Sequence, residues 1–155
     1  MDRDGSIPPD QGATLLSPPR EEPVLSLELH TTAGAIAIPT IRTIAADLAA
    51  RADFDLDSID DLRMAVDDVC AMLVRIAVLN ATLSCWFTVR AERIELAAEV
   101  AADGSVDPLP TKSFGWRVLE SLTDEVSARF RAGAQGESGR MRITLAKGAV
   151  TASQT

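Results

Sequence analysis

The chain has 155 residues, of which 46% are hydrophobic and 25% are charged, and this predicts one ordinary globular domain with a single core. Its net charge of −8 disfavours DNA or RNA as a direct partner, because phosphate binding requires a basic face. The acidity would suit a basic protein surface, or it only keeps the protein in solution. No apolar run is long enough to span a membrane, and the first residues do not form a secretory signal.

The N-terminal region is expected to contain a tail, a strand and a helix. Residues 1–23 hold five of the eight prolines, so we expect a disordered tail that cannot offset its ordering entropy. One domain should span residues 24–147, with residues 148–155 frayed. VLSLELH, from Val24 to His30, alternates like a strand. After the turn TTAGA, Pro39 suits the first turn of a helix that runs through IRTIAADLAARA.

The second predicted helix contains two adjacent carboxylates in an otherwise apolar run. Asp55 or Asp57 can cap it, and its buried stripe is predicted to be Ile59, Leu62, Val66, Val69, Leu73 and Ala77. With about 100° between residues, Asp68 lies nearly opposite this stripe and Met72 follows one turn later on the same face. Asp67 lies on one flank.

The remaining segments complete a mixed α/β pattern. TLSCWFTVR and RIELAAEV are predicted to form a hairpin, and a loop, AADGSVDPLPTK, follows. FGWRVLESL is a short helix, EVSARFRA and RMRITLAK are strands, and AQGESG is the turn between them. The order of elements predicts a two-layer α/β sandwich, with a mostly antiparallel sheet and helices on one face.

Cysteine and histidine usage excludes some kinds of site. Cys70 and Cys85 lie in apolar runs without C-x-x-C spacing, so we expect reduced, buried thiols and a cytoplasmic protein. With His30 as the only histidine, we expect no zinc site. A serine-histidine triad would have to use His30, which closes the first predicted strand, and we favour a structural role there.

Two segments, in the right order and separated by a strand hairpin, resemble one protein family over residues 36–146. LRMAVDDVCAM resembles a family helix that reads L-x-x-A-V-x-E-A-x-x-N. SFGWRVLESLTDEV resembles a later segment that starts G-x-G and ends D-(D/E)-V. The family is the RsbW-type anti-sigma factors, also called switch-protein kinases, and the nearest branch is the actinobacterial one that restrains a sigma-F-like stress sigma factor. The resemblance implies the GHKL (Bergerat) ATPase fold.

The resemblance also implies roles for the polar face of the second helix. Asp68 falls where the family carries a glutamate thought to act as general base toward a serine hydroxyl or water. Met72 replaces an asparagine whose oxygen binds the magnesium of Mg-ATP, and a thioether is no ligand for this metal. Asp67 falls at a variable family position and is expected to be solvated.

The glycine-rich loops of the family are depleted in this chain. The family box Asp-x-Gly-x-Gly is reduced to one glycine, Gly104, with Val100 or Asp103 at the aspartate position. Later in the chain Gly115 is retained, but Ser113 stands where the first glycine belongs. We therefore expect a degenerate ATP site that includes Asp103, Gly104 and Gly115, no firm cofactor, and slow or absent phosphoryl transfer.

The implied partners are proteins. In the family, an arginine on the first helix, 26 residues before the glutamate, contacts both the sigma factor and a competing anti-anti-sigma protein of the STAS type. Arg42 precedes Asp68 by the same 26 residues; otherwise it is an ordinary exposed charge. Phe114 and Trp116 are interface anchors or core. The family also forms dimers around its first strand, and VLSLELH would suit such an edge.

Three functions follow from these residues. The first is a binding regulator that sequesters a sigma factor by protein contacts without ATP. The second is an active protein serine kinase that phosphorylates the anti-anti-sigma factor. The third is a sensor that binds a nucleotide without catalysis. The loss of oxygen and glycine groups from the ATP site favours the first.

Overall fold

The computed structural model describes residues 23–104 and 110–150. Residues 1–22 of the predicted tail (1–23), part of the predicted loop (105–109) and residues 151–155 lie outside the described residues. Among the described residues, none of the helices combines the length and the apolar character needed to cross a membrane.

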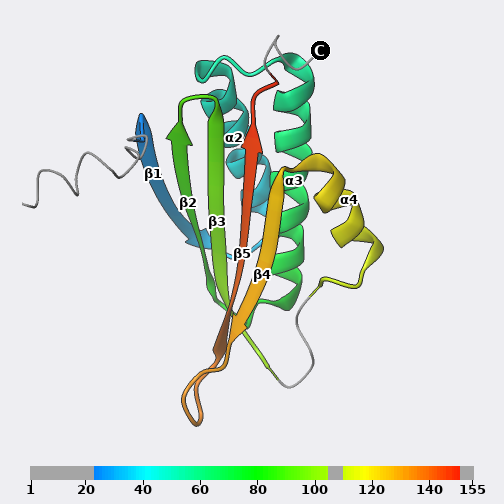
Figure 1. The fold of residues 1–155 in the computed structure, drawn as a ribbon. Helices are drawn as coiled ribbons and strands as arrows, with labels where there is room; N and C mark the ends of the chain where they lie inside the picture. Colours follow the sequence, from blue (N-terminus) through cyan, green and yellow to red (C-terminus); the bar gives the residue numbers. More distant parts are fainter. Residues whose placement is uncertain (1–22, 105–109, 151–155) are drawn as a thin grey trace, which may run out of the picture.

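One antiparallel sheet forms the first layer of the molecule (Figure 1). Its spatial order is β1-β2-β3-β5-β4, so β1 and β4 are the two edges. The strands are β1 (Leu25–Thr32), β2 (Thr82–Arg90), β3 (Arg93–Ala102), β4 (Glu125–Arg131) and β5 (Gly139–Gly148). Every predicted strand is present, and β5 extends to Gly148, the first residue of the predicted C-terminal tail.

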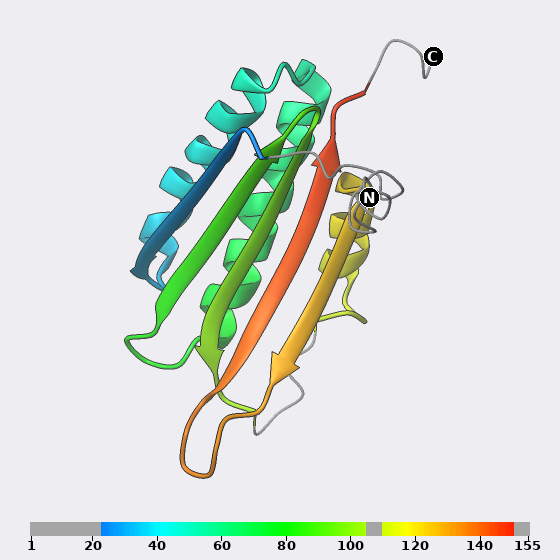
Figure 2. The same cartoon turned by 60° about the vertical axis from the view of Figure 1, so that its left-hand side comes forward.

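Helices form the second layer and cover only one face of the sheet (Figure 2). They are the short 3-10 turn η1 (Ala35–Ala37) and the helices α2 (Ile38–Arg51), α3 (Leu56–Ile76) and α4 (Phe114–Leu122). The predicted two-layer α/β sandwich is confirmed, with antiparallel pairing throughout the described sheet. The segment predicted as the turn TTAGA contains the start of η1.

Local sequence signals start the helices. Proline occupies the first turn of α2, where its missing N–H costs no hydrogen bond. Asp55 is the N-cap of α3, and its carboxylate accepts a hydrogen bond from the Ser58 amide at 3.2 Å. Hydrogen bonding from Ser58, mainly through its side chain and also through this amide, lowers the pKa of Asp55.

The core lies between the two layers. Every second residue of β2 is buried against the helices: Leu83, Cys85, Phe87 and Val89. On α3, the buried stripe contains Leu62, Val66, Val69 and Leu73 as predicted, while Ile59 and Ala77 are only partly buried against it. Both cysteines are buried free thiols, which confirms the sequence prediction.

Candidate functional site

Two of the predicted site residues lie on neighbouring helices, Arg42 on α2 and Asp68 on α3. In the structure, Arg42 forms an ion pair with Asp67, the residue before Asp68. The Nη1 atom of Arg42 donates to Oδ1 of Asp67 at 3.0 Å, and both side chains remain partly exposed, at 36% and 40%. The expectation that Asp67 is only solvated was therefore wrong. Sequence spacing cannot reveal this pair, because it depends on how α2 crosses α3.

A shallow depression surrounds this ion pair. Its volume is about 360 Å³, and it is lined by Arg42, Asp60, Arg63, Met64 and Asp67. Asp60 accepts from Arg63 at 3.4 Å on the same helix. Met64 is 52% exposed. This side of α2 and α3 therefore presents charged groups around an exposed apolar side chain, which is a surface suited to contact with a protein.

Asp68, the candidate base, follows Asp67 on α3 and is partly buried. Burial and the neighbouring charge of Asp67 raise the pKa of this carboxyl above its usual range. A raised carboxylate pKa is a property of general bases, although buried structural carboxylates share it. The burial of Asp68 and the charge beside it are therefore compatible with a role in proton transfer and with a purely structural role.

Met72, one turn after Asp68, contacts helix α4. A Cβ atom added to Gly115 would lie 3.3 Å from the methyl carbon of Met72. The methionine thus fills the space beside this glycine, and both residues belong to a packing contact between α3 and α4. The structure does bring Met72 and Gly115 together, but with a thioether where Mg²⁺ would require oxygen.

The start of α4 explains the serine that replaces a family glycine. Ser113 is the N-cap of the helix, and its hydroxyl accepts from the Trp116 amide at 3.1 Å and donates to the Pro110 carbonyl at 2.8 Å. Trp116 is 4% exposed and belongs to the core, whereas Phe114 is 80% exposed. Of the two candidate interface aromatics, only Phe114 is on the surface.

Asp103 and Gly104 lie at the far end of β3, away from Asp68. The residue before Asp103, Ala102, bridges to Ala77, which directly follows α3. The last residue of α3, Ile76, is roughly 12 Å along the helix axis from Asp68. A Cβ atom on Gly104 would lie 2.9 Å from the Phe130 ring. This glycine therefore has a packing reason to be small.

The donor set does not fit Mg-ATP at the positions that the resemblance implies. Met72 offers sulfur and methyl groups, the Ser113 hydroxyl caps a helix, and Gly104 adjoins an aromatic ring. Among the described residues, no group of three or more histidine, cysteine or acidic side chains could hold a metal ion.

His30 lies on the opposite, uncovered face of the sheet. Its ring nitrogens lie 2.7 Å from the Ser84 hydroxyl and 2.6 Å from the Glu28 carboxylate. These are the residue types of a catalytic triad, but Ser84 lies inside β2, which pairs with strands on both sides. Its neighbouring amides belong to sheet ladders and cannot form an oxyanion hole. The contacts instead join β1 to β2, as a structural role requires.

Comparison with known proteins adds a relationship for most of the chain. No protein-family model matches. Two curated proteins, each named anti-sigma-F factor RsbW and from two strains of Mycobacterium tuberculosis, are 34% identical over 116 residues, which covers 75% of this chain and 68% of each relative. Among solved structures, the histidine kinase domain of a blue-light activated kinase from Erythrobacter litoralis has a TM-score of 0.42 and 11% identity over 87% of this chain and 68% of that one.

Proposed function

Because the chain belongs to the family of anti-sigma factors that includes RsbW, we propose that it binds an alternative sigma factor and sequesters it from RNA polymerase. The proposed target is a stress sigma factor of the sigma-F type. Release then depends on an anti-anti-sigma protein of the STAS type that competes for the same surface. The family relationship is the observation that carries this proposal.

The proposed contact surface is centred on Arg42. Its guanidinium is held by Asp67 at 3.0 Å yet remains partly exposed, so the side chain is oriented before a partner arrives. A planar guanidinium can pair with a partner carboxylate in a two-pronged contact. The adjoining depression, with its exposed Met64, supplies apolar area next to the charge.

Binding is proposed to need no nucleotide. The residues at the implied ATP positions serve packing and helix capping, as described for Met72, Gly104 and Ser113. Phosphoryl transfer depends mainly on positioning and on neutralisation of charge by metal and backbone groups. A site without these groups favours a regulator that works by docking alone.

The proposed working unit is the domain of residues 24–147, acting in the cytoplasm as a homodimer. β1 is an edge strand of the described sheet, and an edge strand offers unpaired backbone groups to a second chain. This placement supports dimer formation through the first strand.

One observation favours an enzyme as the second candidate. The raised pKa of Asp68 would suit a general base in a protein serine kinase that acts on the anti-anti-sigma factor. Such activity requires nucleotide, so nucleotide dependence separates the two functions. A sensor that binds nucleotide without catalysis would show binding but no phosphoryl transfer.

The test is complex formation in nucleotide-free buffer. The purified chain is mixed with each alternative sigma factor of its own genome and passed over a sizing column. Co-elution with one sigma factor, unchanged by added Mg-ATP, supports the proposal. Absence of any complex without nucleotide contradicts it, and transfer of labelled phosphate to an anti-anti-sigma protein that is lost in Asp68→Ala would establish the kinase instead.

A further inference from the structure

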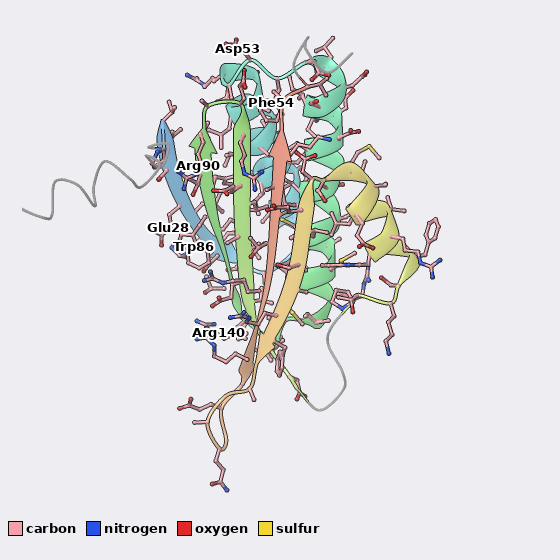
Figure 3. The ribbon with its side chains drawn as sticks, viewed as in Figure 1. Glu28, Asp53, Phe54, Trp86, Arg90 and Arg140 are labelled. Carbon is pink, nitrogen blue, oxygen red and sulfur yellow. The ribbon has the colours of Figure 1, made fainter. Side chains whose placement is uncertain are left out.

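The face of the sheet that the helices leave uncovered carries four arginines at one end. They are here called the arginine face and are Arg129 and Arg131 on β4 with Arg140 and Arg142 on β5. They line a depression of about 330 Å³. Figure 3 shows Arg140, Trp86 and Glu28 on the side of the sheet away from the helices.

The arginines face each other in like-charged pairs. Arg129 is directly opposite Arg142, and Arg131 is directly opposite Arg140. Like charges in directly opposite positions of an antiparallel pair are destabilising. The protein has a net charge of −8, yet positive charges are clustered on this face, where their repulsion lowers stability. Residues that lower stability are often found where they serve a function such as binding.

Of the residues that the structure describes, Glu99 is the one acidic residue that lines this depression. One of its carboxylate oxygens forms an ion pair with Nε of Arg140 at 3.2 Å, and the other accepts a hydrogen bond from Nε of Arg142 at 2.9 Å. The Glu99 side chain is only 16% exposed. Glu99 therefore orients both arginines, and their side chains remain exposed, at 57% for Arg140 and 46% for Arg142.

Arg129 and Arg131 have no ion pair with any of the described residues. Arg142 also stacks over the ring of Trp86, with its guanidinium carbon 5.0 Å from the ring centroid. A rigid sheet thus presents a group of positive charges, and the hydroxyls of Ser127 and Thr144 adjoin them. These groups are all hydrogen-bond donors, so the face suits an acceptor that carries negative charge.

We propose that the arginine face is a docking site for an acidic segment of a partner protein. The arginines repeat at every second position of β4 and of β5, and side chains at this spacing on a strand lie roughly 6.7 Å apart. Carboxylates at alternate positions of an extended partner segment have the same repeat. The site is separate from Arg42, because the helices that carry Arg42 cover the other face of the sheet.

Other occupants fit the face less well. A long nucleic acid would meet the overall charge of −8, which opposes the binding of polyanions. A second copy placed about a two-fold axis at this site would bring arginines against arginines. The depression is a shallow region on an open sheet, whereas small ligands favour sites that enclose most of their surface.

The test uses the full chain and a short peptide that alternates glutamate with alanine. Calorimetry should detect binding, and the emission of Trp86 should change because Arg142 lies over its ring. The change in emission, but not the binding, should disappear in Trp86→Phe. The same peptide with glutamine in place of glutamate should bind at least about tenfold more weakly, as the loss of charged hydrogen bonds predicts.

Arg129→Gln combined with Arg131→Gln should weaken peptide binding at least about tenfold. The melting temperature should stay the same or rise, because the variant also relieves like-charge repulsion. A matched control, Arg75→Gln with Arg117→Gln, removes two exposed helix arginines and should leave binding unchanged. If both double variants lost peptide affinity equally, the loss would come from the change in overall charge and not from the arginine face, and the proposal would be overturned.

Three further results would also overturn it. Tripolyphosphate binding as tight as peptide binding would make the face a small-anion site. Self-association that disappears in the Arg129 and Arg131 variant would assign the face to a second copy. Trp86 emission that changes when the acids of residues 1–22 are replaced by amides would assign it to the chain's own N-terminal segment.

Discussion

The guanidinium of Arg42 and the carboxylate of Asp67 meet at 3.0 Å and tie the surface of α2 to that of α3. Both side chains are more than a third exposed, and exposed ion pairs contribute little to stability. The pair therefore matters more for where it holds Arg42 than for the stability of the fold.

Replacing Arg42 by alanine should separate binding from stability. We expect the free energy of unfolding to fall by less than about 1 kcal/mol, while the complex with the sigma factor weakens at least about tenfold, because a hydrogen-bonded charge contact is lost. Titration calorimetry and thermal melting measure the two effects. The control is Arg51→Ala, on the same helix and also in one ion pair, with Asp47 at 2.8 Å; an equal loss of binding there would remove the special role of Arg42.

Replacing Gly104 by alanine tests whether this glycine is needed for packing or for binding a ligand. A Cβ atom at Gly104 would lie 2.9 Å from the Phe130 ring, and one at Gly139 would lie 2.3 Å from it. We expect Gly104→Ala to destabilise the protein by about 1–3 kcal/mol through overpacking, and Gly139→Ala to cost more. Chemical denaturation gives both values.

The Phe130→Leu background supplies the control for these two glycines. The cost of Gly104→Ala should shrink there, since a smaller, flexible side chain can move away, and the difference is a coupling energy between neighbours. An unchanged cost in this background would show that the glycine is required for another reason.

The shifted pKa of Asp68 makes a prediction about pH. Because its pKa is higher in the folded than in the unfolded chain, the folded state binds more protons between the two values, and stability falls as pH rises through this window. Asp68→Asn should therefore be more stable than the wild type at neutral pH. The difference should vanish below the unfolded-state pKa of about 3.9.

The measurement is a set of paired thermal melts from pH 3 upward, in which the shared effects of other carboxylates cancel. Asp67→Asn is the comparison, since it keeps Asp68 and instead breaks the ion pair with Arg42. If the stability advantage of Asp68→Asn over the wild type grew as the pH was lowered, the prediction would be contradicted.

Nucleotide should not stabilise the wild-type protein. A ligand at about 100 times its dissociation constant adds about 2.7 kcal/mol to the unfolding free energy, so a thermal shift detects even modest affinity. We expect no Mg²⁺-dependent shift at millimolar ATP or ADP. Met72→Asn restores an oxygen ligand at that position, and a magnesium-dependent shift only in this variant would identify Met72 as the cause. A shift in the wild type refutes the expectation.

The two thiols should be unreactive until the protein unfolds. Cys70 and Cys85 are fully buried, and hydrogen bonding to Cys85 together with burial raises the pKa of the Cys70 thiol. We expect both to react with a thiol reagent at least about a thousandfold more slowly than in denaturant, since access requires opening of the core. Rapid labelling of either thiol in the native protein would show that α3 separates locally from β2.

Much of the fold could be predicted from local patterns. Alternation located the strands, and Pro39 and Asp55 marked helix starts that the structure retains. FGWRVLESL was predicted at the same residues that form α4. These signals are local, so a single sequence is sufficient to carry them.

The arrangement of the site depended on contacts between elements that no local pattern encodes. The link between Arg42 and Asp67 required the crossing of two helices, and the closeness of Met72 to Gly115 required the placement of α4. The strands EVSARFR and RMRITLAK were predicted, but the pairing of their arginines needed the register of β4 with β5. Helical spacing could not tell whether Phe114 or Trp116 is buried. The packing of α4 shows that Trp116 is in the core and Phe114 is on the surface.

The two edge strands of the described sheet differ in the charge that they carry. The outer strand β4 carries Glu125, Arg129 and Arg131, and charged side chains discourage the addition of a further strand. β1 begins with the exposed Leu25 and carries fewer charges. If the proposed dimer forms by strand addition, we therefore expect it at β1, and two chains joined there about a two-fold axis would leave no free β1 edge for a third. Growth by this route would end at two subunits and would not continue into a fibre.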